Sequence, residues 1–391
     1  MPSGWPLWLK LRRLTAFLAV GALGFQIHAW GIHRPERVMA LYAKYVEGTP
    51  NLDKRPSSQG EPHPGVRATD YAKILRVAGQ GDVVDLRAKV STYVWRGWDR
   101  PGQRLPDAVE RDVFFPPLAG MANLRSVDKY VIKMPYGVDS TAFVLHPVQE
   151  RPCLMIYQEG HGASFLERRD YLERVVAAGC AAVALSMPLT GGINNQPVID
   201  HPRFGVLTPL NVDALEILNT SSFSAVGFYV TPAMVSLNQI LSERKFDRVG
   251  MTGFSAGGWI TMMVAALDTR IERSYPIAGT APMTVFAPEP GWGDWLQRLA
   301  PLYEIANYPE LYVMGSVGAG RSQMQAFNLD DECCFRGRNA EVYAQAIAKR
   351  AQELGGRFSV RFYDHDEGHA FTDPAQQDVL ADFLGRGGVS G

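Results

Sequence analysis

A serine stands between glycines in the run Gly253-Phe-Ser255-Ala-Gly257, directly after the stretch 248–252. Small neighbours allow the chain to turn sharply from a strand into a helix, and the turn then exposes the serine hydroxyl. Such a hydroxyl can attack an acyl carbon once a base removes its proton. The pattern is weak by itself, because an ordinary turn in a chain with 38 glycines can give the same letters.

Three other segments carry the groups that this chemistry needs. His369 comes late in the chain, and an imidazole can accept and return a proton near neutral pH. The acidic residues 330–332 precede it, and a carboxylate can hold the imidazole in the required tautomer. The loop 158–164 (QEGHGAS) contains glycines that let backbone N–H groups point at an oxyanion. Together these residues predict acyl-transfer chemistry.

Alternating strands and helices are expected to position these residues. Short apolar runs predict buried strands, and amphipathic runs predict helices between them. The predicted strands are 130–136, 141–147, 153–158, 180–188, 248–253, 274–279, 311–316 and 357–364, and the predicted helices are 165–178, 223–244, 256–267 and 340–354. This alternation indicates an α/β fold with a doubly wound, mostly parallel sheet, in which reacting groups gather at the carboxyl ends of strands.

The motifs after three of these strands resemble those of the α/β-hydrolase superfamily. They are GFSAGG at 253–258, EGHGAS at 159–164 and GHAF at 368–371, and the resemblance covers roughly residue 127 to the C-terminus. Chain order adds specificity, because the serine, the acids and the histidine each follow a different predicted strand.

The resemblance implies a role for each matching residue. Ser255 is the expected nucleophile, His369 the base, and the Ala256 N–H one oxyanion donor, while Gly253 and Gly257 form the nucleophile elbow. The acid departs from the pattern. Many members carry it soon after the strand that we place at 311–316, whereas here the acidic cluster follows about fifteen residues later.

Two assignments rest on local reasoning. We expect the second oxyanion donor to be the N–H of His161 or Gly162, because the strand 153–158 ends just before them. His161 itself is expected to position that loop. We predict Asp331 as the acid, because it directly precedes Glu-Cys-Cys-Phe, a segment that a disulfide could stiffen, and because Asp freezes fewer rotamers than Glu332. Asp330 is the nearest alternative.

These residues favour a serine hydrolase that cleaves a carboxylic ester rather than an amide. An exopeptidase-like hydrolase and a non-catalytic, hydrolase-like binding protein of the cell envelope are the alternatives, although a degenerate member usually loses the serine or the histidine. The substrate would be a small-molecule or polymer-borne ester. No cofactor and no metal is predicted: Gly368 interrupts the four-residue spacing of His365 and His369, and the segment follows a strand.

The N-terminal residues 1–31 predict a signal-anchor. Basic residues at 10–13 precede an uncharged, mostly apolar run at 14–30, which is near the lower length limit of a membrane span. The following domain would then be exported. A cleaved signal peptide, giving a secreted protein, and a buried helix are the alternatives.

Residues 32–68 read as a short helix and a Pro-rich linker, and 69–391 as the α/β-hydrolase domain, in which 69–126 form an N-terminal extension of unclear structure. With 39 basic and 40 acidic residues, the chain lacks the basic excess of a nucleic-acid-binding protein. Cys153 and Cys180 are interpreted as small buried strand residues, and a disulfide between them is the alternative if the domain is exported. The oligomeric state is not predicted.

Overall fold

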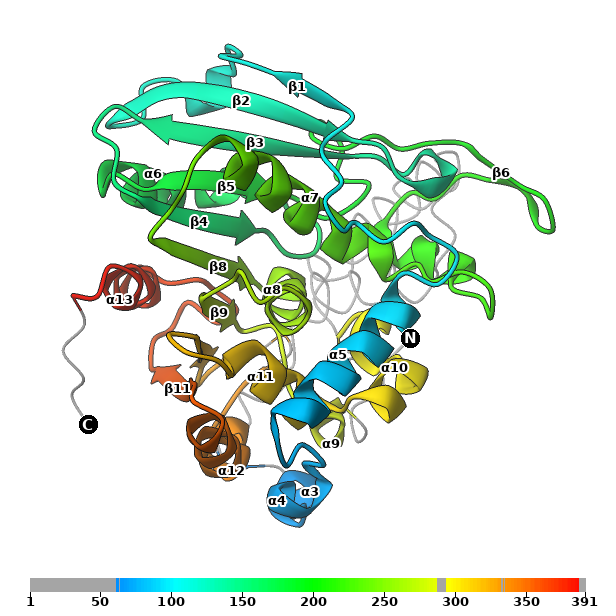
Figure 1. Ribbon diagram of the computed structural model, residues 1–391, viewed down its shortest axis with the longest axis vertical. Helices are drawn as coiled ribbons and strands as arrows, with labels where there is room; N and C mark the ends of the chain where they lie inside the picture. The colour runs from blue at the N-terminus through cyan, green and yellow to red at the C-terminus, as the bar shows by residue number, and fades with distance from the viewer. Residues whose placement is uncertain (1–60, 63, 287–292, 332, 334, 387–391) are drawn as a thin grey trace, which may run out of the picture. The chain divides into compact units, whose positions relative to one another are not determined.

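The computed structural model describes residues 61–386 except 63, 287–292, 332 and 334 (Figure 1). The chain divides into two units, Met1–Gln59 and Gly60–Gly391, and the elements below belong to the second. The predicted signal-anchor at 1–31 therefore lies outside the described residues, as does most of the linker. Among the helices of the described part, none is long and apolar enough to cross a membrane.

A nine-stranded sheet forms the centre of the second unit, in the order β1-β2-β3-β5-β4-β8-β9-β10-β11. Its strands are β1 Ala108–Glu110, β2 Leu124–Ile132, β3 Ser140–Pro147, β4 Cys153–Gln158, β5 Ala181–Leu185, β8 Arg248–Phe254, β9 Arg273–Ile277, β10 Ser322–Asn328 and β11 Arg357–Tyr363. Strands β1, β2, β3 and β5 pair antiparallel in series, and all pairs from β5 to β11 are parallel. The predicted hairpin and the mostly parallel sheet are confirmed.

Helices cover both faces of this sheet (Figure 1). The α-helices of the described part are α3 Pro64–Arg67, α4 Tyr71–Ile74, α5 Gln80–Val94, α6 Arg169–Ala177, α7 Gly227–Glu243, α8 Ala256–Leu267, α9 Met283–Phe286, α10 Ala300–Ile305, α11 Tyr308–Ser316, α12 Asn339–Glu353 and α13 Asp373–Phe383. Helices α6 and α13 cover one face, joined by an Arg174–Asp373 ion pair, whereas α7, α8, α11 and α12 cover the other. The sheet is therefore doubly wound, as predicted.

The helix after the serine, α8, is buried along its whole length between the sheet and α11. A helix that is apolar on all sides belongs in the core rather than at the surface. Its burial fixes the N-terminal end of α8, where Ser255 and Ala256 lie.

The predicted strand at 311–316 is wrong, because those residues form helix α11, and the strand is β10 at 322–328. Every residue of α11 is buried, so its apolar run lacks the one-sided period that marks a surface helix. Strand β10 was missed because Gln323 and Gln325 make it look polar. Both are fully buried, and their amides bond to each other, to Ser274 and to Tyr343.

The interpretation of Cys153 and Cys180 as unlinked residues is also wrong, since they form a disulfide. Cys153 begins β4 and Cys180 directly precedes β5, so the bond joins the starts of two adjacent parallel strands. Each cysteine has the burial expected of a core residue, and burial alone does not distinguish a free thiol from a disulfide.

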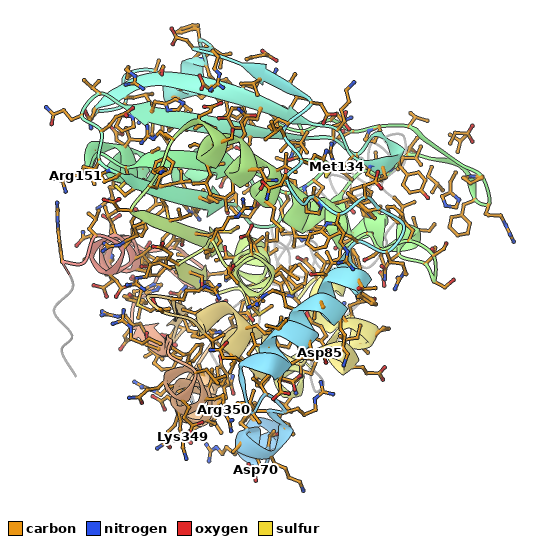
Figure 2. The ribbon with its side chains drawn as sticks, viewed as in Figure 1. Asp70, Asp85, Met134, Arg151, Lys349 and Arg350 are labelled. Atoms are coloured by element: carbon orange, nitrogen blue, oxygen red, sulfur yellow. A yellow bond between two sulfur atoms is a disulfide. The ribbon has the colours of Figure 1, made fainter. Side chains whose placement is uncertain are left out.

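The extension at 69–126 adds α5, which packs against α8 and α10, and the edge strand β1. Nearby, Asp70 caps α4, and Arg350 of α12 donates to the Ala78 carbonyl at 3.1 Å. Figure 2 labels Asp70 beside α4 and Arg350 on α12.

A second long insertion, at 189–222, holds the hairpin β6 Ile199–His201 and β7 Gly205–Leu207 and the 3₁₀ helix η4 Val212–Leu218. The arrowheads of β4 and β8 point to the side of the molecule where this insertion lies (Figure 1).

Candidate active site

Ser255 occupies a strained turn between β8 and α8. Its φ of 55° and ψ of −128° lie outside the regions that non-glycine residues ordinarily adopt. The turn is held from the neighbouring strand, because the Ser255 N–H donates to the Ile277 carbonyl at 2.9 Å. Ser255 is partly exposed while its chain neighbours are buried. This geometry presents one hydroxyl at the carboxyl end of a central strand.

Glycines around this turn are required by close contacts. A Cβ on Gly253 would lie 2.2 Å from the Gly257 carbonyl oxygen, and one on Gly257 would lie 2.1 Å from the Gln158 carbonyl oxygen. On the other side, a Cβ on Gly279 would lie 2.0 Å from the Ser255 carbonyl oxygen. Real Cβ atoms do not approach so closely, so the sharp turn needs glycine at each of these positions.

Asp331 and His369 are brought into direct contact. His369 Nδ1 lies 2.7 Å from Asp331 Oδ2, and the other carboxylate oxygen accepts from the Cys333 N–H at 2.9 Å. Asp331 is fully buried, whereas Asp330 is exposed. Asp331 follows the end of β10 at Asn328 by only three residues. The apparent departure from the hydrolase pattern therefore came from placing the strand at 311–316, and the acid loop is short.

His369 is held beside the serine turn by several contacts. Its ring lies 4.7 Å, centroid to centroid, from the ring of Phe254, which directly precedes Ser255. The buried Asn328 side chain donates to the carbonyls of Gly368 and Ala370 at 3.0 and 2.8 Å. His369 Nε2 is buried and has no hydrogen-bond partner among the described residues. An imidazole held through Nδ1, with Nε2 available, can act as a general base.

The glycine-rich loop after β4 packs against the serine turn. A Cβ on Gly160 would lie 2.7 Å from Ser255 Cβ and 3.3 Å from the Ala256 nitrogen. The Gly160 N–H donates to Glu159 at 2.8 Å, whereas no described residue accepts from the N–H of His161 or Gly162. The loop therefore lies directly against the Ser255 turn, and the N–H groups of His161 and Gly162 stay the candidates for a second oxyanion donor.

The side chain of Glu159 supports the glycine-rich loop through a hydrogen bond. Its carboxyl group is buried, accepts from the Tyr157 hydroxyl at 2.6 Å and from the Gly160 N–H, and has a raised pKa because burial disfavours its charge. Glu159 is therefore a buried side chain that supports the loop carrying His161 and Gly162.

A second histidine near the serine turn, His161, also faces carboxylates. Its Nδ1 lies 2.6 Å from Asp294 Oδ1, and its Nε2 lies 3.9 Å from Asp213 Oδ2. The hydrogen bond to Asp294 raises the pKa of the imidazole. Asp294 begins the short helix 295–298, whose Gln297 side chain donates to the Gly279 carbonyl at 2.8 Å. His161 thus connects the glycine-rich loop to the insertion 189–222 and to the segment beside Ser255.

Comparison with known proteins gave matches in structure alone. Scans of the sequence against protein-family models and against curated proteins gave no match. Similar solved structures include a methylesterase (18% identity, 82% of this chain, 67% of that chain, TM-score 0.54), an acetyl xylan esterase from Paenibacillus sp. R4 (18%, 83%, 99%, 0.50) and a glucuronoyl esterase from Solibacter usitatus (14%, 79%, 93%, 0.52). The chain has the α/β-hydrolase fold. At these identities the likeness establishes the fold and leaves the chemistry to the site.

Two groups of side chains in the described part of the hydrolase domain could offer metal ligands within 4.8 Å of one another. One is Asp331, Cys333 and His369, but the Cys333 sulfur is committed to a disulfide. The other is His161, Asp213 and Asp294, in which Asp294 and Asp213 face opposite ring nitrogens of the histidine. In this second group the His161 ring is already hydrogen-bonded to Asp294.

Sequence reasoning missed Asp294 and Asp213 as partners of His161 in the hydrolase domain. Asp294 is 133 residues from His161, and no local pattern connects the two. The available signal was compositional: Asp294 lies in the Trp- and Gly-rich run 291–295 after β9, where a long insertion could reach the site.

Proposed function

We propose that this chain is a serine hydrolase that cleaves carboxylic esters. The observation that carries the proposal is the buried Asp331–His369 hydrogen bond beside the strained Ser255 turn, with His369 Nε2 buried and without a partner among the described residues. The similar structures that are named as esterases support ester hydrolysis over other reactions of the fold. Ser255 is the proposed nucleophile, His369 the base and Asp331 the acid.

The proposed reaction proceeds in two acyl-transfer steps. His369 Nε2 takes the Ser255 Oγ proton as Oγ attacks the ester carbonyl, and the oxyanion receives hydrogen bonds from the Ala256 N–H and from the N–H of His161 or Gly162. The imidazolium returns the proton to the leaving alkoxide, which departs as the alcohol and leaves an acyl-serine. Water then loses a proton to His369, attacks the acyl-serine and releases the acid, which regenerates Ser255.

Labelling with a fluorophosphonate probe tests this proposal. The purified protein is expected to be labelled, and Ser255→Ala is expected to lose both labelling and ester hydrolysis. The exposed Ser221→Ala is the matched control and should label like the wild type. Labelling that survives Ser255→Ala, or no labelling of the folded wild-type protein, would remove the proposal.

Esters and amides with the same acyl group separate the esterase from the exopeptidase-like alternative. We expect the protein to hydrolyse the alkyl ester of a given acyl group and to leave the amide of the same acyl group, including a peptide bond, without measurable hydrolysis. A chain that binds an envelope polymer without hydrolysing any ester would instead support the non-catalytic alternative.

We also propose that the hydrolase domain is exported and held to a membrane by residues 1–31. The Cys153–Cys180 disulfide supports the oxidising compartment, because such bonds are rare in the reducing cytosol. Carbonate extraction of membranes, with intact mass measurement, tests the anchor. A soluble product whose mass lacks the N-terminal segment would favour the secreted alternative.

A further inference from the structure

A second strained turn lies against the Ser255 turn. Ala278, directly after β9, has a φ of 42°, in the left-handed region that non-glycine residues seldom adopt. The next residue, Gly279, lies so close to the serine that a Cβ on it would be 2.0 Å from the Ser255 carbonyl oxygen. Strained turns of this kind persist only where the surrounding structure holds them. A displacement of Gly279 would therefore displace Ser255 as well.

The side chain that holds this second turn is the amide of Gln297, in the short helix 295–298. Gln297 is 2% exposed. Its Nε2 donates to the Gly279 carbonyl at 2.8 Å, and its Oε1 accepts from the Asp294 N–H at 2.8 Å. A buried amide costs free energy of folding unless it is hydrogen-bonded, and here both of its ends are bonded. The two bonds join the turn beside Ser255 to the start of the helix 295–298.

The helix 295–298 is itself fixed to the helices that follow it. The Tyr303 hydroxyl of α10 donates to the Leu296 carbonyl at 2.8 Å. The Tyr308 hydroxyl of α11 donates to the Gln297 carbonyl at 2.9 Å. The Gln297 side chain therefore extends from a firmly held backbone, and such a backbone can hold another segment in place.

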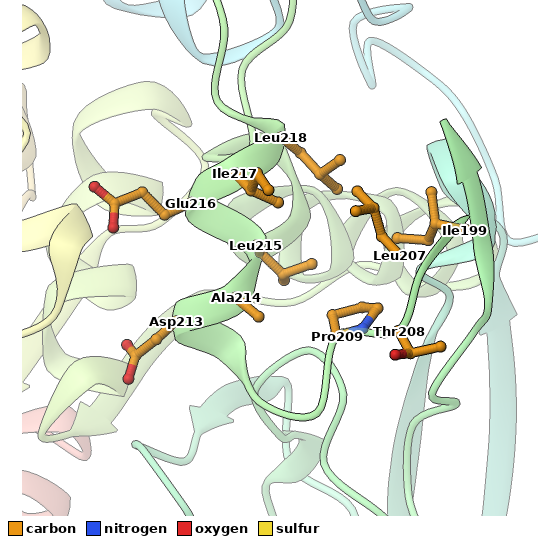
Figure 3. Close-up of a pocket in the computed structure, with 10 residues that line it drawn as sticks. All are labelled: Ile199, Leu207, Thr208, Pro209, Asp213, Ala214, Leu215, Glu216, Ile217 and Leu218. Carbon is orange, nitrogen blue, oxygen red and sulfur yellow. The ribbon is translucent and has the colours of Figure 1, made fainter. Parts of the chain in front are cut away.

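The same helix reaches the glycine-rich loop through Asp294. Asp294 Oδ1 lies 2.6 Å from His161 Nδ1, and the Asp294 side chain is 12% exposed. Asp213 faces the other ring nitrogen, but its carboxylate is 3.9 Å away and its side chain is 57% exposed. Figure 3 shows the Asp213 side chain directed away from Ile199 and Leu207, across η4. Asp294 is therefore the contact that fixes the His161 ring.

These contacts form a closed series around the nucleophile. The series runs through Ser255, Gly279, Gln297, Asp294, His161 and Gly160, and returns to Ser255. We propose that Gln297 is a positioning residue for the acyl-transfer site. Through its two hydrogen bonds it holds the serine turn and the glycine-rich loop in one arrangement, so that the oxyanion donors from the two segments stay in register. This inference rests on the proposed esterase function and adds a residue outside the triad.

Removal of the Gln297 amide tests this role. Gln297→Met keeps the volume but loses both hydrogen bonds, so the oxyanion donors should shift while substrate binding is retained. Such misplacement costs up to about 10²-fold in rate, so kcat for p-nitrophenyl acetate should fall roughly 30-fold while KM changes less than about twofold. Unchanged kcat in a folded variant, or a change in KM alone, would overturn the inference.

Asn238→Leu is the matched control. The Asn238 side chain is also buried, and its amide donates to the carbonyls of Gly102 and Arg104 rather than to the serine turn. This variant loses a buried amide of the same kind and should keep the wild-type kcat. An equal fall of kcat in Asn238→Leu and Gln297→Met would overturn the inference, because it would show that any buried amide has this effect.

A second variant keeps the test decisive where Gln297→Met does not fold. Gln297→Glu retains an acceptor for the Asp294 N–H, but an ionised carboxylate cannot donate to the Gly279 carbonyl. Burial and the neighbouring Asp294 charge should raise the pKa of the introduced carboxyl, and burial keeps the Tyr308 pKa well above its ordinary value. The ratio of variant to wild-type kcat should rise as the pH falls from about 8 to about 5, because the protonated carboxyl can donate. A constant ratio would overturn the inference.

A double-mutant cycle tests whether the two ends of the series act together. His161→Ala removes the ring that Asp294 holds and is expected to lower kcat less than Gln297→Met does. The double variant should lose no more than Gln297→Met alone, because residues in one hydrogen-bonded series do not act additively. Losses that multiply would overturn the inference.

Amide hydrogen exchange separates failure of this inference from failure of the proposed function. Peptides covering 158–164 and 277–281 should exchange faster in Gln297→Met than in the wild type, and at the wild-type rate in Asn238→Leu. Faster exchange in Gln297→Met, with no ester hydrolysis by the wild type, would remove the esterase proposal and keep the positioning contacts. Ester hydrolysis by the wild type, with unchanged exchange in Gln297→Met, would remove this inference and keep the esterase.

Discussion

Two Asp–His pairs lie close to Ser255, and their hydrogen bonds have nearly the same length. His369 Nδ1 lies 2.7 Å from Asp331, and His161 Nδ1 lies 2.6 Å from Asp294. Their surroundings differ. The Asp331 side chain is 0% exposed and that of His369 17%, whereas His161 is 36% exposed. The second ring nitrogen of His369 is buried without a partner among the described residues, while that of His161 faces Asp213.

This difference shows that an Asp–His hydrogen bond does not by itself define a base. A base must have a nitrogen that is free to take a proton from the nucleophile, and His369 meets this condition. His161 lies between two carboxylates that favour its protonated form, and the bond to Asp294 raises its pKa. We infer that His161 acts as a cationic link between loops, whereas His369 does the proton transfer.

The largest expected effect separates the two carboxylates. Asp331→Asn should lower kcat for ester hydrolysis on the order of 10⁴-fold, as the corresponding change does in serine proteases, because the imidazole tautomer is no longer held. Asp294→Asn should lower kcat by less than about tenfold. Steady-state kinetics with circular dichroism for folding measures both, and the exposed Asp330→Asn is the matched control. Equal losses in the Asp331 and Asp294 variants would contradict the distinction.

A smaller effect is expected from removing the brace behind His369. Asn328→Ala deletes the two hydrogen bonds to the Gly368 and Ala370 carbonyls and should allow the histidine loop to shift. Misplacement of this kind costs up to about 10²-fold in rate, so kcat should fall while KM changes little. Asn328→Asp, which keeps the size but cannot donate when ionised, should behave like the Ala variant. Wild-type kcat in either variant would show that the brace is dispensable.

The smallest effect concerns stability at the exposed pair. Because its folded pKa is raised, His161 contributes stability that is fully present below the unfolded pKa, near 6.5, and is lost as pH rises through the folded value. His161→Gln should therefore lower the urea midpoint most at about pH 5 and least at about pH 9. The carboxylates facing the ring are Asp294 and Asp213. A difference between wild type and variant that is constant with pH would refute this account.

The elements that could be predicted from the sequence are those whose burial is indicated by a continuous run of apolar residues. Strand β4 and helix α8 match their predicted bounds, and strand β8 differs by one residue, because apolar runs and flanking glycines mark their ends. The sequence also narrowed the acid to 330–332. Within that cluster the sequence favoured Asp331 over Asp330, and the structure buries Asp331 against His369 and leaves Asp330 exposed.

The parts that could not be predicted depend on contacts between distant segments. Strand β10 looks polar in the sequence because it contains two glutamines. It can nevertheless be buried, because both glutamines have hydrogen-bond partners on other elements. Helix α11 reads as a buried strand because it is enclosed on all sides. The His161–Asp294 pair joins residues 133 positions apart. In each case the information lies in the neighbours that a side chain meets after folding.

The buried glutamines of β10 also bear on how the sheet assembles. Gln323 and Gln325 point to one face, where Tyr343 of α12 donates to Gln325 at 2.9 Å and Gly315 of α11 leaves room for the Gln323 amide. A purely aliphatic strand could slide by two residues between β9 and β11 and still bury the same kind of surface. In β10 such a slip would leave the side-chain amides of Gln323 and Gln325 without hydrogen-bond partners, at a cost of about 1–3 kcal/mol for each unpaired group. The polar pair therefore selects one alignment during folding, and that alignment sets the depth at which Asp331 emerges beside His369.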